Sequence, residues 1–102
     1  GQIGDVAYSA SKAGVVGMTL PMARDFSRQG VRICTISPGV FDTSMMAASS
    51  DQSRDSLIDM VQYPKRMGLP TEFALLSEQI VENPYLNGET IRLDGGIRVA
   101  AN

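Results

Sequence analysis

Two short strand-like segments separated by a helical segment constrain the fold of this chain more than any other feature. Residues 31–37 are mostly β-branched or apolar and are followed by Pro38-Gly39, which is typical of a buried strand that ends in a turn. Residues 89–93 have the same character and are followed by Asp94-Gly95-Gly96. Because parallel neighbours need a long return connection, the intervening helix predicts an α/β fold with a parallel sheet.

A long helix is predicted before the first strand. From residue 5 to residue 27, apolar residues recur at roughly helical spacing, and Gly30 stands where such a helix would stop. Small residues dominate its first half and would let another backbone or a flat ligand approach closely. Pro21 lies inside the pattern and predicts a kink.

The segment between the two strands is expected to hold a loop and two helices. Residues 40–55 lack clear periodicity, and a short helix is predicted at residues 56–62. A longer helix begins at Pro70, carries an apolar stripe and ends before Asn83-Pro84. Asn87-Gly88 then predicts a tight turn into the second strand.

Composition excludes several kinds of site. With no histidine and a single cysteine, the chain cannot form a Ser-His-Asp triad, a structural zinc site or an intrachain disulfide, and Cys34 is expected to be a small core residue. The net charge of -2 comes without a block of like charges, which argues against a nucleic-acid partner. No apolar run approaches the roughly 20 residues that span a bilayer. We therefore expect no metal, no nucleic acid and no membrane partner.

Tyr8 and Lys12 are the strongest candidates for catalytic residues. They are four residues apart in the predicted helix, so they lie on one face, separated by about 6 Å of axial rise. An ammonium near a phenol stabilises the phenolate and lowers the tyrosine pKa from its ordinary value of about 10, which favours acid/base behaviour at neutral pH. A pair with this spacing is common by chance, so its meaning depends on the motifs around it.

Three ordered motifs resemble the short-chain dehydrogenase/reductase family over essentially the whole chain. They are the helical Tyr8-Ser9-Ala10-Ser11-Lys12, the strand end from Pro38-Gly39 to Thr43, and Asn87-Gly88-Glu89 with the following residues 92–96. Within the family, the narrower resemblance is to type II 3-hydroxyacyl-CoA dehydrogenases. It is carried by residues 17–21, 23–25 and 82–89.

The resemblance implies a Rossmann-type, doubly wound parallel sheet, with residues 1–102 as the C-terminal part of a single NAD(P)-binding domain. The family's Gly-rich loop, its ribose selector and its catalytic serine would all lie upstream of this chain. Two strands do not make a stable open sheet, and the sequence enters a helical pattern within a few residues of Gly1, which agrees with a start inside a domain. We therefore expect the 102-residue chain alone to be inactive.

The resemblance also assigns roles to individual residues. Tyr8 would be the general acid/base at the substrate oxygen. Lys12 would lower the pKa of Tyr8 and hold the nicotinamide ribose. Both residues would therefore be catalytic and would also contact the cofactor. The other cofactor-binding residues would supply backbone groups along the carboxamide edge of the nicotinamide, together with one hydroxyl. They are Pro38, Gly39, Val40, Phe41 and Thr43.

By the same resemblance, the expected cofactor is NAD, with NADP left open, and the expected substrate is a 3-hydroxyacyl-CoA or another secondary alcohol or ketone. A homotetramer in the cytoplasm, or in the mitochondrial matrix of a eukaryote, is implied as well. The alternatives are a 3-oxoacyl-carrier-protein reductase, a hydroxysteroid dehydrogenase, and a non-catalytic fragment or homologue that serves assembly. Met45 and Met46 either line an apolar substrate wall or pack within the loop.

Overall fold

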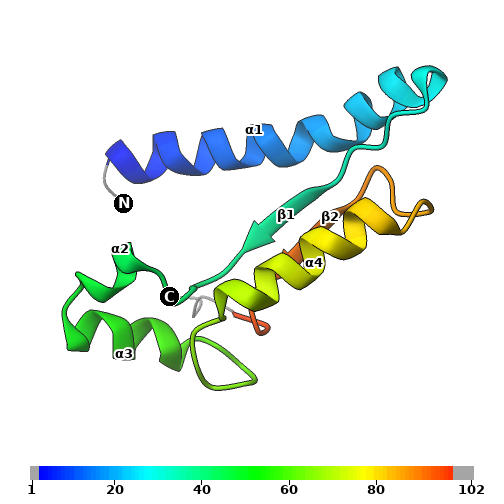
Figure 1. The fold of residues 1–102 in the computed structure, drawn as a ribbon. Helices are drawn as coiled ribbons and strands as arrows, with labels where there is room; N and C mark the ends of the chain where they lie inside the picture. Colours follow the sequence, from blue (N-terminus) through cyan, green and yellow to red (C-terminus); the bar gives the residue numbers. More distant parts are fainter. Residues whose placement is uncertain (1–2, 98–102) are drawn as a thin grey trace. The chain divides into compact units, whose positions relative to one another are not determined.

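A computed structural model describes residues 3–97, and for residues 3–9 and Met45 it describes the backbone alone. The chain divides into two compact units, Gly1–Ile36 with Glu82–Ile91 and Ser37–Val81 with Arg92–Asn102, which are described separately below. Figure 1 shows the order of the elements. They are α1 (Ile3–Phe26), a 3-10 turn η1 (Ser27–Gln29), β1 (Thr35–Pro38), α2 (Ser44–Ala47), α3 (Asp51–Asp59), α4 (Pro70–Glu82) and β2 (Thr90–Leu93).

Helix α1 matches the predicted first helix closely. It continues through Pro21 and passes into η1 after Phe26. Gly30 then adopts a left-handed conformation with φ 72°, and its N–H donates to the carbonyl of Ser27. Because glycine adopts positive φ without a steric penalty, Gly30 is confirmed as the residue at which the helical segment stops.

Strands β1 and β2 form a two-stranded sheet. The Thr35 N–H donates to the carbonyl of Glu89 at 3.0 Å, and the Gly39 N–H donates to that of Leu93 at 2.9 Å. Partner numbers rise together along both strands, so the pair is parallel, as the sequence predicts.

The first strand is shorter than predicted, because β1 begins at Thr35 and the expected start at residue 31 is wrong. The Ile33 N–H donates to the side-chain oxygen of Asn87 at 2.9 Å rather than to a strand carbonyl, while the Ile33 carbonyl accepts from the Gly88 N–H. At this end of β1, the side chain of Asn87 therefore accepts the hydrogen bond that a neighbouring strand would otherwise accept. Cys34 is half-buried rather than a core residue.

The second unit contains one confirmed helix and one misplaced one. Helix α4 begins at Pro70 as predicted. The short helix predicted at residues 56–62 is wrong in position, because α3 begins at Asp51, where the Ser50 hydroxyl accepts the Ser53 N–H at 3.1 Å. This N-cap starts the helix inside the expected loop, and α2 forms there too.

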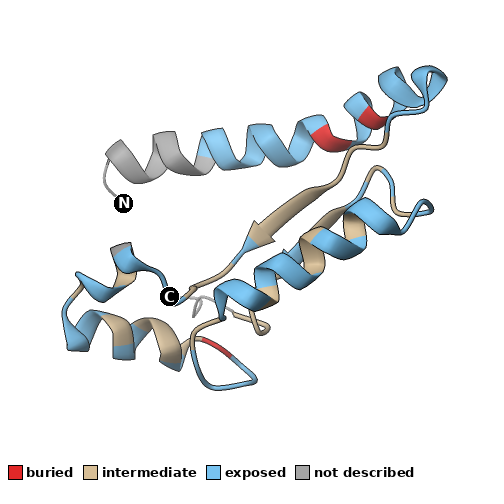
Figure 2. Ribbon diagram, in the orientation of Figure 1, coloured by how far each residue is buried: buried red, intermediate tan, exposed pale blue. Residues whose placement is uncertain are grey.

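Few apolar side chains are fully buried in the part of the chain that the structure describes. Figure 2 shows how little of either unit is buried, and the buried apolar residues are Ala23 and Val61. Met18 is 53% exposed on α1 and Leu75 is 64% exposed on α4. Apolar helices exposed to this extent are typical of elements that pack against further protein. No helix among residues 3–97 has the length and hydropathy needed to cross a membrane.

Candidate active site

The predicted catalytic pair lies on α1, in the first unit. Tyr8 and Lys12 are both within the helical part of Ile3–Phe26, so their backbones are one turn apart on the same face. The Lys12 side chain is exposed, and the Tyr8 side chain lies outside the described atoms. The expected helical placement of the pair is therefore present in the backbone.

The predicted cofactor residues lie in the second unit, where the chain leaves β1. A Cβ on Gly39 would lie 2.6 Å from the Cβ and 2.8 Å from the Cα of Asp94. The small size of Gly39 is thus required by the protein's own packing at this point. Asp94 accepts from the Gly96 N–H at 3.0 Å and also pairs with Arg92 at 2.7 Å.

Phe41 is held in place by a short parallel bridge to Gly68. The Gly68 N–H donates to the Val40 carbonyl and the Gly68 carbonyl accepts from the Asp42 N–H, both at 2.8 Å. Since the bridge uses the peptide groups that flank Phe41, the N–H and C=O of Phe41 itself face away from Gly68. The Phe41 ring packs edge-on against Phe73, with centroids 5.9 Å apart.

Thr43 has a structural partner that the sequence did not reveal. Its hydroxyl accepts from the Met46 N–H at 3.3 Å, and its carbonyl accepts from the Ala47 N–H at 2.9 Å. Thr43 therefore caps the start of α2. The residue is exposed, and a hydroxyl with one accepted bond can still donate to a ligand.

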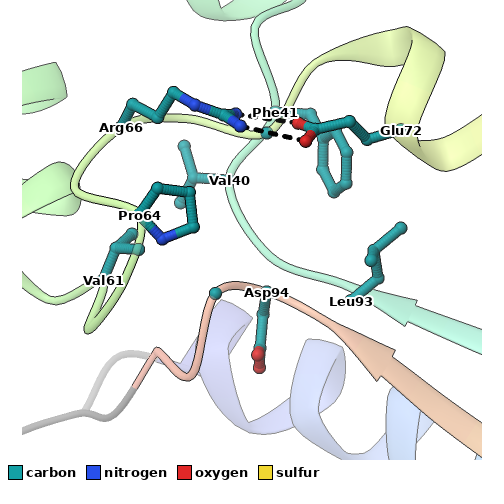
Figure 3. Close-up of a pocket in the computed structure, with 10 residues that line it drawn as sticks. Val40, Phe41, Val61, Pro64, Arg66, Glu72, Leu93 and Asp94 are labelled. Atoms are coloured by element: carbon teal, nitrogen blue, oxygen red, sulfur yellow. Dashed lines mark hydrogen bonds and ion pairs between the residues drawn. The ribbon is translucent and has the colours of Figure 1, made fainter.

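A largely apolar pocket of about 210 Å³ lies beside this loop, and Figure 3 shows the residues around it. It includes Val40 and Phe41 from the predicted site, and the other lining residues come from the segment before α4, from its first turn and from the end of β2. These are Val61, Pro64, Arg66, Gly68, Glu72, Leu93, Asp94 and Gly95.

Arg66 and Glu72 form a two-bond ion pair at this pocket, as the dashed lines in Figure 3 show. The guanidinium nitrogens lie 2.8 and 2.9 Å from the carboxylate oxygens, and Glu72 also accepts from the Leu69 N–H at 2.8 Å. Hydrogen bonds from Arg66 and then from Leu69 lower the pKa of Glu72 to about 2. The sequence carries a signal for this arrangement, because a glutamate at the third position of a helix commonly reaches back to the capping N–H.

Replacing Glu72 by glutamine should remove a pH-dependent part of the protein's stability. Because the folded-state pKa lies below its ordinary value of 4.5, the ion pair stabilises the fold above that pH, and its contribution is lost as the pH falls toward about 2. Urea unfolding at a series of pH values should therefore show a deficit for Glu72→Gln at neutral pH that shrinks on acidification. Glu78→Gln, on the same helix, makes the same charge change and is the control. Parallel pH curves for the two variants would contradict the assignment.

The described residues contain no group of three or more histidine, cysteine, aspartate or glutamate side chains suited to a metal ion. The second unit carries Pro38, at the end of β1, and Gly39, Val40, Phe41 and Thr43 in the loop that follows, while the first unit carries Tyr8 and Lys12. Each half of the predicted site is thus a connected local structure.

Comparisons with known proteins agree on one family. The family described as enoyl-(acyl carrier protein) reductase matches residues 2–98. A 3-hydroxyacyl-CoA dehydrogenase type-2 of Drosophila melanogaster is 59% identical over 97% of this chain and 39% of its own length. The human 3-hydroxyacyl-CoA dehydrogenase type-2 is 52% identical over 97% of this chain and 38% of its own length. A 3-oxoacyl-acyl-carrier-protein reductase of Vibrio cholerae is 36% identical over 95% of this chain and 40% of its own length.

Among solved structures, a 3-hydroxyacyl-CoA dehydrogenase type-2 from Mycobacterium avium superposes with a TM-score of 0.90 and 43% identity. The match covers 98% of this chain and 39% of that one, so the chain spans about two fifths of the length of these relatives. The sequence matches and the structural match each cover nearly the whole of this chain. The chain belongs to the short-chain dehydrogenase/reductase family.

Proposed function

We propose that residues 1–102 are the C-terminal part of a single NAD(P)-binding domain, in an oxidoreductase that interconverts 3-hydroxyacyl-CoA and 3-oxoacyl-CoA. The observation that carries the proposal is the 59% identity to a 3-hydroxyacyl-CoA dehydrogenase type-2 over a segment in which α1 places Tyr8 and Lys12 on one face. Tyr8 and Lys12 are the proposed catalytic residues. The chain alone, without the remaining sequence that its relatives have, would be inactive.

In this reaction Tyr8 removes the hydroxyl proton of the alcohol, and the carbon to which that hydroxyl is bound loses its hydrogen as hydride. NAD, when bound, supplies the hydride acceptor, so the products are the ketone and NADH, with the proton on Tyr8 passing to solvent. Lys12 stabilises the phenolate form of Tyr8 through its positive charge and offers hydrogen bonds to ribose hydroxyls. The reverse reaction uses the same groups with Tyr8 as the acid.

The loop after β1 has the chemistry that a nicotinamide requires. A carboxamide presents donors and an acceptor on one edge, and the N–H and C=O of Phe41, which face away from Gly68, offer the complementary pair. The exposed hydroxyl of Thr43 adds a further donor. Pro38, Gly39, Val40, Phe41 and Thr43 are therefore proposed to hold the nicotinamide end of NAD, together with Lys12 and Tyr8.

A homotetramer acting on a small-molecule substrate is part of the same proposal, in the cytoplasm or, in a eukaryote, in the mitochondrial matrix. The exposed apolar surfaces of α1 and α4 support burial against further protein. A 3-oxoacyl-carrier-protein reductase is the second candidate, because one such enzyme is 36% identical over 95% of this chain. The higher identity to the acyl-CoA enzymes places it second.

The test is an assay of the full-length protein with 3-hydroxybutyryl-CoA, in which NADH formation is followed with NAD and, in parallel, with NADP. We expect turnover with the acyl-CoA substrate and a preference for NAD. A preference for NADPH and an acyl-carrier-protein thioester would favour the second candidate. Absence of turnover with both substrate classes would contradict the proposed acyl thioester substrates and leave a hydroxysteroid dehydrogenase or a protein that serves assembly.

A further inference from the structure

Three threonine hydroxyls join α1 to both strands in the first unit. Thr19 is 3% exposed and is the buried polar residue among those whose burial is described. Its Oγ1 lies 2.6 Å from the Oγ1 of Thr35 on β1 and 3.4 Å from that of Thr90 on β2. It also donates to the carbonyl of Val15, one turn earlier on the helix, at 3.3 Å. One oxygen atom is thus shared by three elements.

This oxygen has three hydrogen-bond partners. A threonine hydroxyl has one proton to donate and two lone pairs that accept. Thr19 donates to the Val15 carbonyl and accepts from Thr90, and in its short contact with Thr35 either hydroxyl can be the donor. The threonine cluster, defined as Thr19, Thr35 and Thr90, therefore specifies a direction for the side chain of Thr19 as well as a distance.

Apolar packing beside the threonine cluster is tight but not directional. A Cβ on Gly88 would lie 3.1 Å from Leu20 Cδ1 and 3.5 Å from the Cβ of Ala23, which is 3% exposed. Such contacts set how closely α1 approaches the start of the sheet. Hydrogen bonds weaken steeply when bent, so the cluster also sets the rotation of α1 about its own axis.

The threonine cluster acts where the helix is intrinsically weak. Pro21 has no N–H to donate to the carbonyl four residues earlier, at Gly17, and glycine itself lowers helix stability. Thr19 lies between these two residues. Fixing its side chain therefore restrains the turn at which the N-terminal part of α1 could most easily bend or roll.

The same stripe of α1 carries the proposed catalytic pair. At 3.6 residues per turn, Lys12 is about two turns and Tyr8 about three turns before Thr19, and each falls within about 20° of the position of Thr19 around the axis. The cluster therefore determines which way the face bearing Tyr8 and Lys12 is turned.

We infer that Thr19 is a positioning residue for the reaction: through Thr35 and Thr90 it sets the rotation of α1 at which Tyr8 and Lys12 meet substrate and cofactor. The inference rests on the proposed function of that pair. Thr19 touches neither substrate nor cofactor and acts through the helix.

The test compares Thr19→Val, which keeps the shape but removes the hydroxyl, with Thr19→Ser, which keeps the hydroxyl, both in the full-length protein. We expect kcat with 3-hydroxybutyryl-CoA to fall by about tenfold to a hundredfold in the valine variant, since small misplacements of reacting groups cost that much. The serine variant should recover most of it. In a Lys12→Met background, Thr19→Val should cause a smaller further loss than in the wild type, because the part of its effect that acts through Lys12 is already gone.

The control is Thr71→Val, the same change at an exposed threonine on α4, which should keep wild-type kcat. Equal losses in the valine and serine variants, or a valine variant with lowered Tm and unchanged kcat, would overturn the inference. So would full additivity with Lys12→Met. Should Thr19→Val not fold, Thr35→Val removes the shortest bond of the cluster and carries the same expectations. Near-normal turnover in Tyr8→Phe would instead overturn the catalytic role proposed for Tyr8, on which this inference rests.

Discussion

Replacing Tyr8 by phenylalanine in the full-length protein is expected to lower kcat with 3-hydroxybutyryl-CoA by roughly 10²–10⁴-fold, the usual contribution of a positioned acid/base group. The substitution keeps the ring and removes only the hydroxyl that exchanges a proton with the substrate. The position of Tyr8 on α1, one turn before Lys12, is kept because phenylalanine and tyrosine have similar helix propensity. Initial rates of NADH formation measure the effect.

Tyr85→Phe is the matched control for this experiment. Tyr85 is 97% exposed in the turn region before β2, and the same loss of a hydroxyl there should leave kcat unchanged. NAD affinity, measured by fluorescence titration, should change far less than kcat in Tyr8→Phe, because the other proposed cofactor-binding residues remain, and should be unchanged in Tyr85→Phe. Turnover of Tyr8→Phe close to that of Tyr85→Phe would remove Tyr8 from the reaction.

Gly39→Ala is expected to have the largest effect on stability. The new Cβ would lie 2.6 Å from the Cβ and 2.8 Å from the Cα of Asp94, and a backbone atom cannot move aside as the end of a long side chain can. Overpacking of this kind costs about 1–3 kcal/mol of unfolding free energy, which urea unfolding would measure. Because relief requires the loop after β1 to move, NAD affinity should fall as well.

Gly30→Ala separates this steric effect from a conformational one. Gly30 has φ 72° and nothing within 4 Å of a built Cβ, so alanine there meets strain of about 1–2 kcal/mol without a clash. It should lower stability and leave NAD affinity unchanged. If Gly39→Ala had no effect on either stability or NAD affinity, the close approach of Asp94 would not constrain the loop.

Much of the fold could be predicted because local signals and the overall topology agree. Pro70 begins α4, and the helix between the strands required a parallel pair. Two predicted element boundaries, the start of α3 and the start of β1, were wrong because side chains make hydrogen bonds there that the sequence pattern does not show. The Ser50 hydroxyl starts α3 earlier than its apolar periodicity suggests, and the Asn87 side chain takes the Ile33 N–H that a longer β1 would have used.

The candidate site was predictable where it follows contiguous motifs. Tyr8 with Lys12, and the residues from Pro38 to Thr43, each lie within one short segment, so their spacing alone places them. The threonine cluster joins residues 16 and 71 positions apart in sequence, and no periodicity links them. Contiguous motifs could be predicted and the threonine cluster could not, because contacts between residues far apart in sequence leave no local pattern.

The parallel register has a consequence for the order of folding events. Partners such as Ile33 and Asn87 are 54 residues apart, so pairing the strands closes a long loop, whereas the turns of α3 and α4 need only neighbouring residues. Helices form in about a microsecond or less, while non-local strand pairing carries the entropy of loop closure and is slow. The threonine cluster is complete only when both strands have joined α1. A chain that stalls before this step is rich in helix and has not yet fixed the rotation of α1.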